Sequence, residues 1–165
     1  MKTTTPLVCQ RFESPLGTML LAATDRGLAG LWFPGQRHGP AAPPGPEVAN
    51  HPVLEEAARQ LRAYFAGERS GFGLPIDFAR GTPFQQSVWQ ALLAIPAGET
   101  TSYGELGRRV GKPQAARAIG AAVGRNPVSV VVPCHRVLGT AGALTGYAGG
   151  IERKTALLKL EGALV

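Results

Sequence analysis

Short apolar runs, some alternating with polar positions, occupy the first third of the chain. They cover residues 7–12, 18–24 and 28–33, and turn-forming residues lie between them at 15–17 (Pro-Leu-Gly) and 25–27 (Asp-Arg-Gly). Runs of this length bounded by such residues are typical of β-strands, and Asp-Arg-Gly between two of them favours a tight hairpin. We therefore predict three strands here.

The spacing becomes helical after an irregular segment over 34–52 that is rich in Pro, Gly and Ala and predicts a loop. Between residues 52 and 65 apolar positions recur every three to four residues, which predicts a helix. A short strand is predicted at 74–78. Thr82 followed by Pro83 is typical of a helix start, and we predict a helix that continues to Leu93.

Two shorter helices are predicted next, over 102–110 and 114–124. The first begins at Ser102 with Glu105 three residues later, in a capping-box pattern. Gly-Lys-Pro at 111–113 makes a tight turn between them, so the pair resembles a helix-turn-helix. A last helix is predicted over 151–160, after a Gly-rich segment.

The composition indicates a globular protein. The chain has 165 residues, of which 44% are apolar and 17% charged, so it can bury a core in one domain or two small ones. No apolar stretch reaches membrane-spanning length, and the N-terminus lacks the apolar segment of a signal peptide.

Two cysteines make no disulfide framework, which favours a reducing cytoplasm. Cys9, His38 and His51 fit no compact zinc motif, so we predict no obligatory metal, and whether any metal binds the N-terminal half stays open. We predict no cofactor.

Positive charge is concentrated in the second half. Residues 82–165 hold nine Lys and Arg against four Asp and Glu, and residues 103–136 hold six against one. Such clustering favours a polyanionic partner, although a solvated basic surface without a partner gives the same pattern.

The helix predicted over 114–124 consists mostly of Ala and Gly, with Arg117 as its one long cation. A helix that reads the major groove usually offers Asn, Gln or Arg to the bases. Small side chains instead allow close approach of the backbone to DNA, as minor-groove binding requires, or packing against another helix. Both interpretations stay open from the residues alone.

An apolar run over 128–132 predicts a buried strand that leads to Pro133, Cys134 and His135. A thiol becomes a nucleophile as thiolate, and a neighbouring imidazole oriented by a carboxylate is the usual way to form it. Because a free thiol has a pKa of about 8.5, we expect the site to lower the pKa of Cys134. The carboxylates available in this half are Glu99, Glu105, Glu152 and Glu161.

The context of Cys134 resembles a known family. Asn-Pro-Val at 126–128, Val-Pro-Cys-His-Arg-Val at 132–137 and Tyr-Ala-Gly-Gly at 147–150 closely resemble the O6-alkylguanine-DNA alkyltransferases. The resemblance runs from Phe84 to Glu161 and includes Thr-Ser-Tyr-Gly-Glu-Leu at 101–106. Residues before about 80 match only loosely.

The resemblance implies an α+β fold. Residues 1–81 would form an N-terminal, RNase H-like domain with a β-sheet and a helix. Residues 82–165 would form a mostly helical domain with the helix-turn-helix and the active-site turn. The implied activity is irreversible repair of O6-alkylguanine in double-stranded DNA, with minor-groove binding, base flipping and alkyl transfer to Cys134. Whether O4-alkylthymine is also repaired and which alkyl groups are accepted stay open. We expect a monomer in solution, and whether several copies bind DNA cooperatively stays open as well.

The resemblance also implies roles for individual residues. In the transfer reaction, Cys134 would be the alkyl acceptor, His135 its base, Glu161 the group that orients His135, Tyr103 the proton donor to the purine, and Asn126 a brace for the turn. In DNA binding, Arg117 would fill the space of the flipped base. The other DNA contacts would come from Tyr103, Ala118, Ala121, Gly124 and Arg136. The base pocket would be lined by Ser129, Val137, Tyr147 and Ala148, and the backbone at Val137 and Ala148 would contact the guanine edge.

Two other functions are compatible with this sequence. Alkyltransferase-like proteins bind lesions on the same scaffold but lack the nucleophile, whereas Cys134 is present here. A cysteine hydrolase could use Cys134, His135 and Glu161, but it would leave Arg117 and the basic helix pair without a role.

Overall fold

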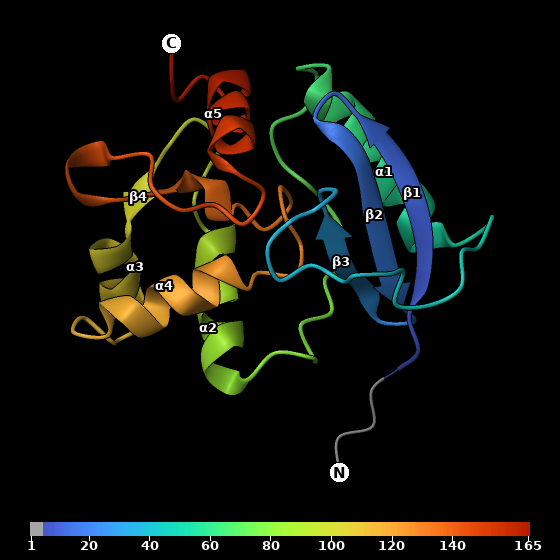
Figure 1. The fold of residues 1–165 in the computed structure, drawn as a ribbon, viewed down its shortest axis with the longest axis horizontal. Helices are drawn as coiled ribbons and strands as arrows, with labels where there is room; N and C mark the ends of the chain where they lie inside the picture. Colours follow the sequence, from blue (N-terminus) through green and yellow to red (C-terminus); the bar gives the residue numbers. More distant parts are fainter. Residues whose placement is uncertain (1–4) are drawn as a thin grey trace.

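The computed structural model describes residues 5–165 and divides into two halves that pack side by side (Figure 1). One half contains a three-stranded sheet with helix α1 across it, and the other contains helices α2 to α5. The fold is α+β, as predicted. Our division at residue 81 stays a prediction, since buried apolar side chains from both halves form one continuous cluster.

The sheet consists of β1 (Val8–Ser14), β2 (Gly17–Thr24) and β3 (Gly27–Trp32), all antiparallel and in sequence order. All three predicted strands are confirmed, as is the hairpin between β2 and β3. Gly27 adopts φ 150°, and a Cβ there would lie 2.5 Å from the carbonyl oxygen of Pro75, so the position favours glycine.

Helix α1 (Pro52–Phe65) packs on the sheet through Leu54, Ala57, Leu61 and Tyr64, which are all buried. The strand predicted at 74–78 is wrong: only one parallel bridge forms, between Leu28 and Ile76. Its neighbour Pro75 has no N–H to donate, which limits further pairing.

The predicted helices of the second half are present, with small differences at their ends. Helix α2 (Pro83–Leu93) begins with a complete capping box between Thr82 and Gln85. Helix α3 spans Tyr103–Arg109, and helix α4 spans Ala116–Gly124. Helix α4 begins two residues later than predicted, because Ala115 has non-helical dihedrals and offers no side-chain cap.

Only half of the capping box predicted at α3 forms. Ser102 accepts a hydrogen bond from the Glu105 amide, but the carboxylate of Glu105 pairs with Arg108 and Arg109. Two strands that we did not predict, β4 (Thr101–Ser102) and β5 (Val137–Leu138), pair in parallel beside it.

The apolar run over 128–132 is not the buried strand that we predicted. It forms a tight turn with a single bridge to the sheet, between Leu31 and Val128, and Val130 adopts a left-handed φ of 70°. Periodicity cannot distinguish a buried strand from a buried turn when every position is apolar. The turn is stabilised by Asn126, whose amide donates to the Val132 carbonyl at 2.8 Å and whose Oδ1 accepts from the Val128 amide at 3.0 Å.

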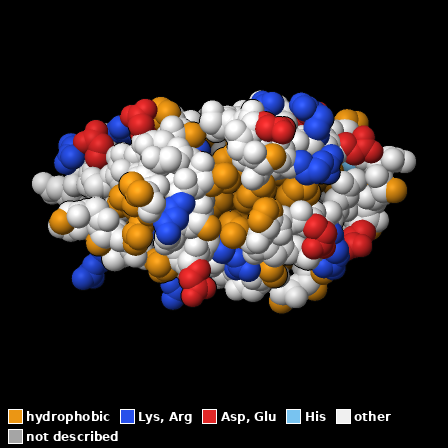
Figure 2. Space-filling view, turned by 90° about the horizontal axis from the view of Figure 1, so that it is seen from above, with side chains coloured by type: hydrophobic (Ala, Val, Ile, Leu, Met, Phe, Trp, Pro, Cys, Tyr) orange, Lys and Arg blue, Asp and Glu red, His pale blue; other side chains and the backbone are white. Residues whose placement is uncertain are grey.

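The turn leads into a short 3-10 helix, η1 (Cys134–Arg136), and then into β5. A second 3-10 turn, η2 (Thr140–Gly142), precedes the last helix, α5 (Ile151–Leu160), which confirms the predicted one. On the face seen from above, apolar side chains gather in a hollow near the middle (Figure 2). Within residues 5–165, no helix is long and apolar enough to cross a membrane.

Candidate active site

Cys134 is the first residue of η1, directly after the apolar turn. Cys134 is 6% exposed, and its backbone amide donates to the carbonyl of Val132. Because Asn126 also binds that carbonyl, one side chain links the turn to the start of η1. The thiol is therefore held by a backbone that has little freedom to move.

A cavity of about 260 Å³ gives access to Cys134. Its walls come from α3 and α4, from the segment before α5, and from the loop after β3. They are formed by Tyr103, Gly120, Ala121, Val123, Gly124, Arg125, Gly146, Tyr147, Ala148, Arg37 and His38. The fold thus brings five of the predicted site residues, Tyr103, Ala121, Gly124, Tyr147 and Ala148, to the same cavity as Cys134.

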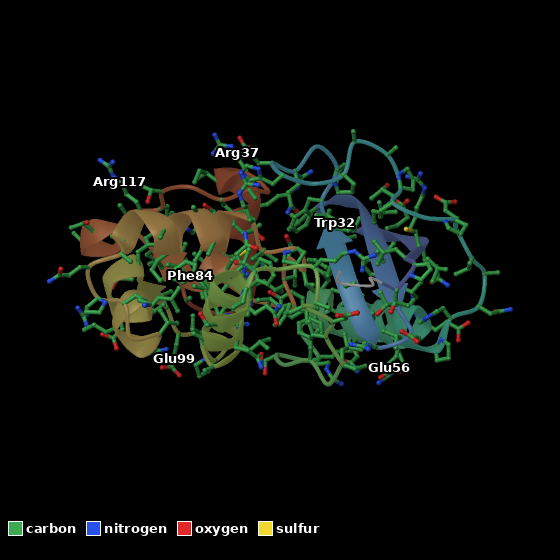
Figure 3. The ribbon with its side chains drawn as sticks, turned by 90° about the horizontal axis from the view of Figure 1, so that it is seen from below. Trp32, Arg37, Glu56, Phe84, Glu99 and Arg117 are labelled. Atoms are coloured by element: carbon green, nitrogen blue, oxygen red, sulfur yellow. The ribbon has the colours of Figure 1, made fainter. Side chains whose placement is uncertain are left out.

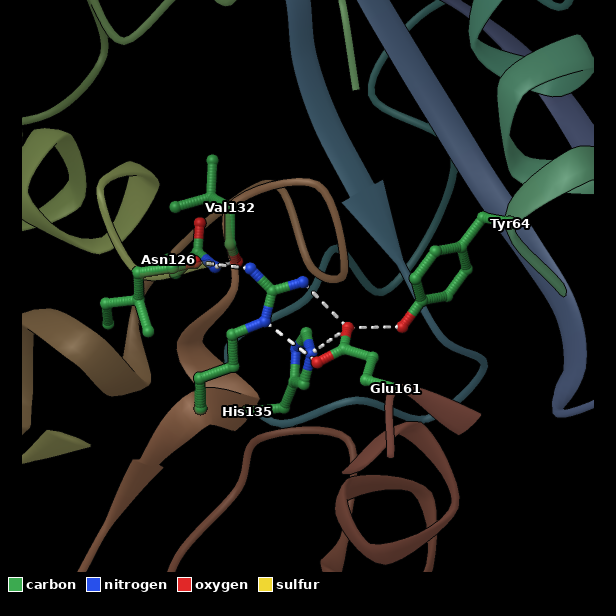
Figure 4. A network of polar contacts seen from close by, with 7 residues as sticks. Tyr64, Asn126, Val132, His135 and Glu161 are labelled. Atoms are coloured by element: carbon green, nitrogen blue, oxygen red, sulfur yellow. Dashed lines mark hydrogen bonds and ion pairs between the residues drawn. The ribbon is translucent and has the colours of Figure 1, made fainter. Parts of the chain in front are cut away.

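Behind the cavity, the carboxylate of Glu161 is the centre of a polar network (Figure 4). Nε2 of His135 lies 2.8 Å from its Oε2, and Arg136 donates to both oxygens at 2.8 Å. The hydroxyl of Tyr64, on α1, donates to Oε2 at 2.6 Å. Of these contacts, the sequence predicted only the one between Glu161 and His135.

The charges in this network follow from burial and hydrogen bonding. Burial alone would raise the pKa of Glu161, but hydrogen bonds from Arg136 and His135 outweigh it and lower the pKa to about 2. Burial lowers the pKa of His135 despite its bond with Glu161, which favours a neutral imidazole. An ionised Glu161 only accepts hydrogen bonds, so Nε2 carries the imidazole proton and Nδ1 holds a lone pair. That Nδ1 is buried without a hydrogen-bond partner among the described residues.

Burial raises the pKa of Cys134, although Asn126 and the ammonium of Lys154 act in the opposite direction. We expected a lowered pKa, so the direction of the shift is a correction. A buried thiolate costs more to desolvate than these groups recover. The thiol of the free protein is therefore protonated at neutral pH and needs a base when it reacts.

Lys154 is a buried cation that the sequence analysis missed. The residue is 0% exposed, and its ammonium donates to the carbonyls of Val137 (2.6 Å) and Thr145 (3.0 Å). It therefore links β5 to the segment that forms one wall of the cavity. Its position three and four residues before the buried Leu157 and Leu158 was a signal that it faces the core.

Three of the predicted site residues do not line the cavity, and their predicted contacts stay predictions. Arg136 is 6% exposed, and its guanidinium donates to Glu161 and to the carbonyl of Ile95. Ser129 is buried and donates to Oε1 of Gln36 at 3.0 Å, outside the cavity. Val137, for which we predicted a backbone contact with the base, is buried, and its carbonyl accepts a hydrogen bond from Lys154.

The exposed face of α4 carries the remaining predicted DNA contacts. Ala118 and Ala121 are exposed beside Arg117, whereas Ile119, Ala122 and Val123 pack into the core. Arg117 and Arg37 project from the same edge of the molecule, opposite to Glu56 and Glu99 (Figure 3). The packing interpretation is confirmed for the buried face of α4, and minor-groove binding by its exposed face stays a prediction.

The loop after β3 contributes to the cavity, which the sequence analysis did not predict. Arg37 and His38 line it, and the Arg37 amide donates to the carbonyl of Ala148 at 2.9 Å. This contact joins segments more than a hundred residues apart, and no local pattern signals it.

Within residues 5–165, no three His, Cys, Asp or Glu side chains are grouped to hold a metal ion.

Two family profiles match this chain. Residues 7–78 match the ribonuclease-like domain of 6-O-methylguanine DNA methyltransferase, and residues 83–163 match the DNA-binding domain of the same family. Together they account for both halves of the fold.

Similar proteins cover nearly the whole chain. The methylated-DNA–protein-cysteine methyltransferase of Methanosarcina acetivorans is 49% identical over 152 residues, which are 92% of this chain and 96% of that protein. The protein of the same name from Mycobacterium leprae is 48% identical over 93% of this chain and 91% of its own. The crystal structure of Mycobacterium tuberculosis OGT in complex with DNA has a TM-score of 0.85 and 47% identity, with 94% of this chain and 93% of that chain covered.

Proposed function

This chain belongs to the 6-O-methylguanine DNA methyltransferase family, and we propose that it repairs alkylated DNA by direct reversal, with Cys134 as the alkyl acceptor. One observation carries the assignment of the acceptor: Cys134 opens on the same cavity as Tyr103 and the exposed face of α4. The second cysteine, Cys9, is buried in β1 and does not line this cavity.

The proposed reaction transfers one alkyl group from O6 of guanine to sulfur. The sulfur of Cys134 attacks the alkyl carbon, the bond from that carbon to O6 breaks, and its electron pair stays with the purine. Tyr103 donates a proton to the departing base, and Nδ1 of His135 accepts the thiol proton through a water molecule. A proton then passes from His135 through solvent to Tyr103, which restores both groups. A thiol and an ether thus become a thioether and unmodified guanine, with no co-reactant.

The electrostatics of the site support this order of events. Burial keeps both Cys134 and His135 neutral in the free protein, so charge separates only when the base is bound. The imidazolium that then forms lies beside the carboxylate of Glu161, which stabilises it. Asn126 holds the turn so that the sulfur keeps its position relative to the alkyl carbon.

DNA is the partner, and we propose that the lesion is O6-alkylguanine turned out of the helix. A base stacked in a duplex cannot reach a thiol inside a cavity of about 260 Å³, so the reaction requires base flipping. The small residues exposed on α4 support binding in the minor groove, and we propose that the exposed Arg117 fills the space of the absent base. We propose that the protein acts as a monomer in the cytoplasm, where a reducing environment keeps Cys134 as a free thiol.

Incubation with a duplex oligonucleotide containing O6-methylguanine, followed by mass spectrometry of the peptides, tests this function. We expect one added methyl group on the peptide with Cys134, none on the peptide with Cys9, and never more repaired guanine than protein. The Cys134→Ser variant is the control and should bind the oligonucleotide without repairing it. Repeated turnover would contradict irreversible transfer, and tight binding by the unmodified protein without methylation would favour a lesion-binding role.

A further inference from the structure

Tyr64 brings a hydroxyl from α1 to the network behind the reactive cysteine. It lies 97 positions before Glu161, is 1% exposed, and donates to Oε2 of that carboxylate at 2.6 Å. Phe65 and Phe72 fix its ring, with centroids 5.2 and 5.3 Å away. The half of the molecule that contains the sheet therefore reaches the reactive groups of the other half.

The hydrogen bond from Tyr64 reaches the same carboxylate oxygen of Glu161 that faces His135. Oε2 of Glu161 lies within hydrogen-bond distance of three donors: the Tyr64 hydroxyl at 2.6 Å, Nε2 of His135 at 2.8 Å and Arg136 at 2.8 Å. Oε1 accepts only from Arg136 among the described residues. A carboxylate has about four lone-pair sites over its two oxygens, so three donors compete for one crowded oxygen.

We propose that Tyr64 is a positioning residue for alkyl transfer, which sets the orientation and the basicity of His135 through Glu161. The inference rests on the proposed function, in which His135 accepts the thiol proton. The Tyr64 hydroxyl takes up negative charge at the oxygen that faces His135, and it prevents the carboxylate from turning away.

Tyr64 can perform this role throughout the working pH range. Burial and the charge of Glu161 raise its pKa, so the hydroxyl stays protonated and remains a donor. The titratable and charged groups that act on the His135–Glu161 pair come from α1, η1, α5 and the segment before it: Tyr64, Cys134, Arg136, Tyr147 and Lys154.

Removal of the hydroxyl should make His135 more basic. Oε2 loses one donor and carries more negative charge toward Nε2, which stabilises the imidazolium and raises its pKa. Since only neutral His135 can accept the thiol proton, the transfer rate should begin to fall at a higher pH. The strength of one hydrogen bond corresponds to a shift of about half a unit to one pH unit.

The experiment compares single-turnover methyl transfer by the wild type and by Tyr64→Phe between about pH 5 and pH 9. Phenylalanine keeps the packing of the ring and removes only the donor. We expect the acidic limb of the profile to move upward by about half a unit to one unit. Superimposable profiles would overturn the inference, as would a rate that falls equally at every pH.

A matched control separates this effect from loss of stability. Thr24, in the same half of the molecule as Tyr64, also donates a buried hydroxyl to a carboxylate, that of Asp77, at 2.6 Å. It does not contact the Glu161 network. Thr24→Val should lower the unfolding midpoint about as much as Tyr64→Phe, with an unshifted profile. If the wild type itself transfers no methyl group to Cys134, the proposed function fails. If the wild type transfers the methyl group and the pH profile of Tyr64→Phe is the same as that of the wild type, only this inference fails.

Discussion

Arg117 is the long cation among the small side chains on the exposed face of α4, and its role can be tested separately from that of the thiol. Arg117→Ala should slow repair of a duplex much more than reaction with a free O6-alkylguanine analogue. Unstacking a base costs a few kcal/mol. If stacking of the guanidinium recovers about 1.4 kcal/mol of this cost, its loss should slow repair of the duplex about tenfold. The measurement is the ratio of the two rate constants in the variant and the wild type.

Arg62→Ala provides the control for loss of charge, because Arg62 is also exposed on a helix but lies on α1. It should leave the ratio unchanged. Equal losses on duplex and free analogue in Arg117→Ala would rule out base replacement.

At the scale of single residues, the sequence predicted Cys134, His135 and Tyr103 as candidates because they lie in a distinctive motif. It could not predict the direction of the Cys134 pKa shift, which depends on burial from many parts of the chain. It could not predict the burial of Arg136 either, because a buried and an exposed arginine next to a reactive cysteine look the same in sequence.

Among the elements, the turn before η1 depends on one side chain. In Asn126→Ala, the Val128 amide loses its partner inside the protein, whereas the Val132 carbonyl keeps the hydrogen bond from the Cys134 amide. One unpaired buried amide and the loss of a second donor to the Val132 carbonyl should lower the free energy of unfolding by about 1–3 kcal/mol. Displacement of the sulfur should also slow methyl transfer by about ten- to a hundredfold. Urea denaturation and single-turnover kinetics measure the two effects.

Thr82→Ala is the control at the same scale. It removes the N-cap of α2, whose side chain accepts from the Gln85 amide, and should cost about 1 kcal/mol. Transfer by this variant should keep the wild-type rate in proportion to folded protein. A similar loss of rate in both variants would show that Asn126 acts only through stability.

The elements that the sequence predicted correctly carry local signals. Thr82 and Ser102 cap the helices that follow them, and residues 25–27 form the expected hairpin. The turn at 128–132 carries no such signal, because its left-handed residue is Val130 rather than a glycine. Contacts with Asn126 and Leu31 impose that conformation.

For the whole molecule, the pKa of Glu161 predicts a loss of stability in acid. The pKa is lowered from 4.5 to about 2 in the folded state, so ionised Glu161 stabilises the fold fully above pH 4.5. This contribution should disappear as the pH falls toward 2. Glu161→Gln should be less stable at neutral pH, where it leaves Arg136 uncompensated, and should lose less stability between pH 4.5 and 2.

Glu56→Gln is the matched control for this acid effect. Hydrogen bonds from Arg59 and Gln60 also lower the pKa of Glu56 to about 2, but that pair is exposed to solvent. Because water and salt screen exposed pairs, we expect little change in the acid profile. If both variants changed the profile equally, burial of the Glu161 network would not be the source of its stability.

Long-range contacts are the part of the site that the sequence could not predict. Tyr64 meets Glu161 across 97 positions, and Gln36 meets Ser129 across 93. Such pairs depend on how the two halves pack, and a single sequence shows neither their distance nor their direction.

The sheet has a further consequence, because short segments of chain protect both of its edges. On β1, Cys9 exchanges backbone hydrogen bonds with Pro46 and Val48. On β3, Leu28 does so with residues 75–77, and Leu31 with residues 127–129. Each covering segment contains a proline, which cannot donate a backbone hydrogen bond to another strand. An unpaired edge can recruit the strand of another molecule and begin aggregation, and these bridges occupy donors and acceptors on both edges that such a strand would need.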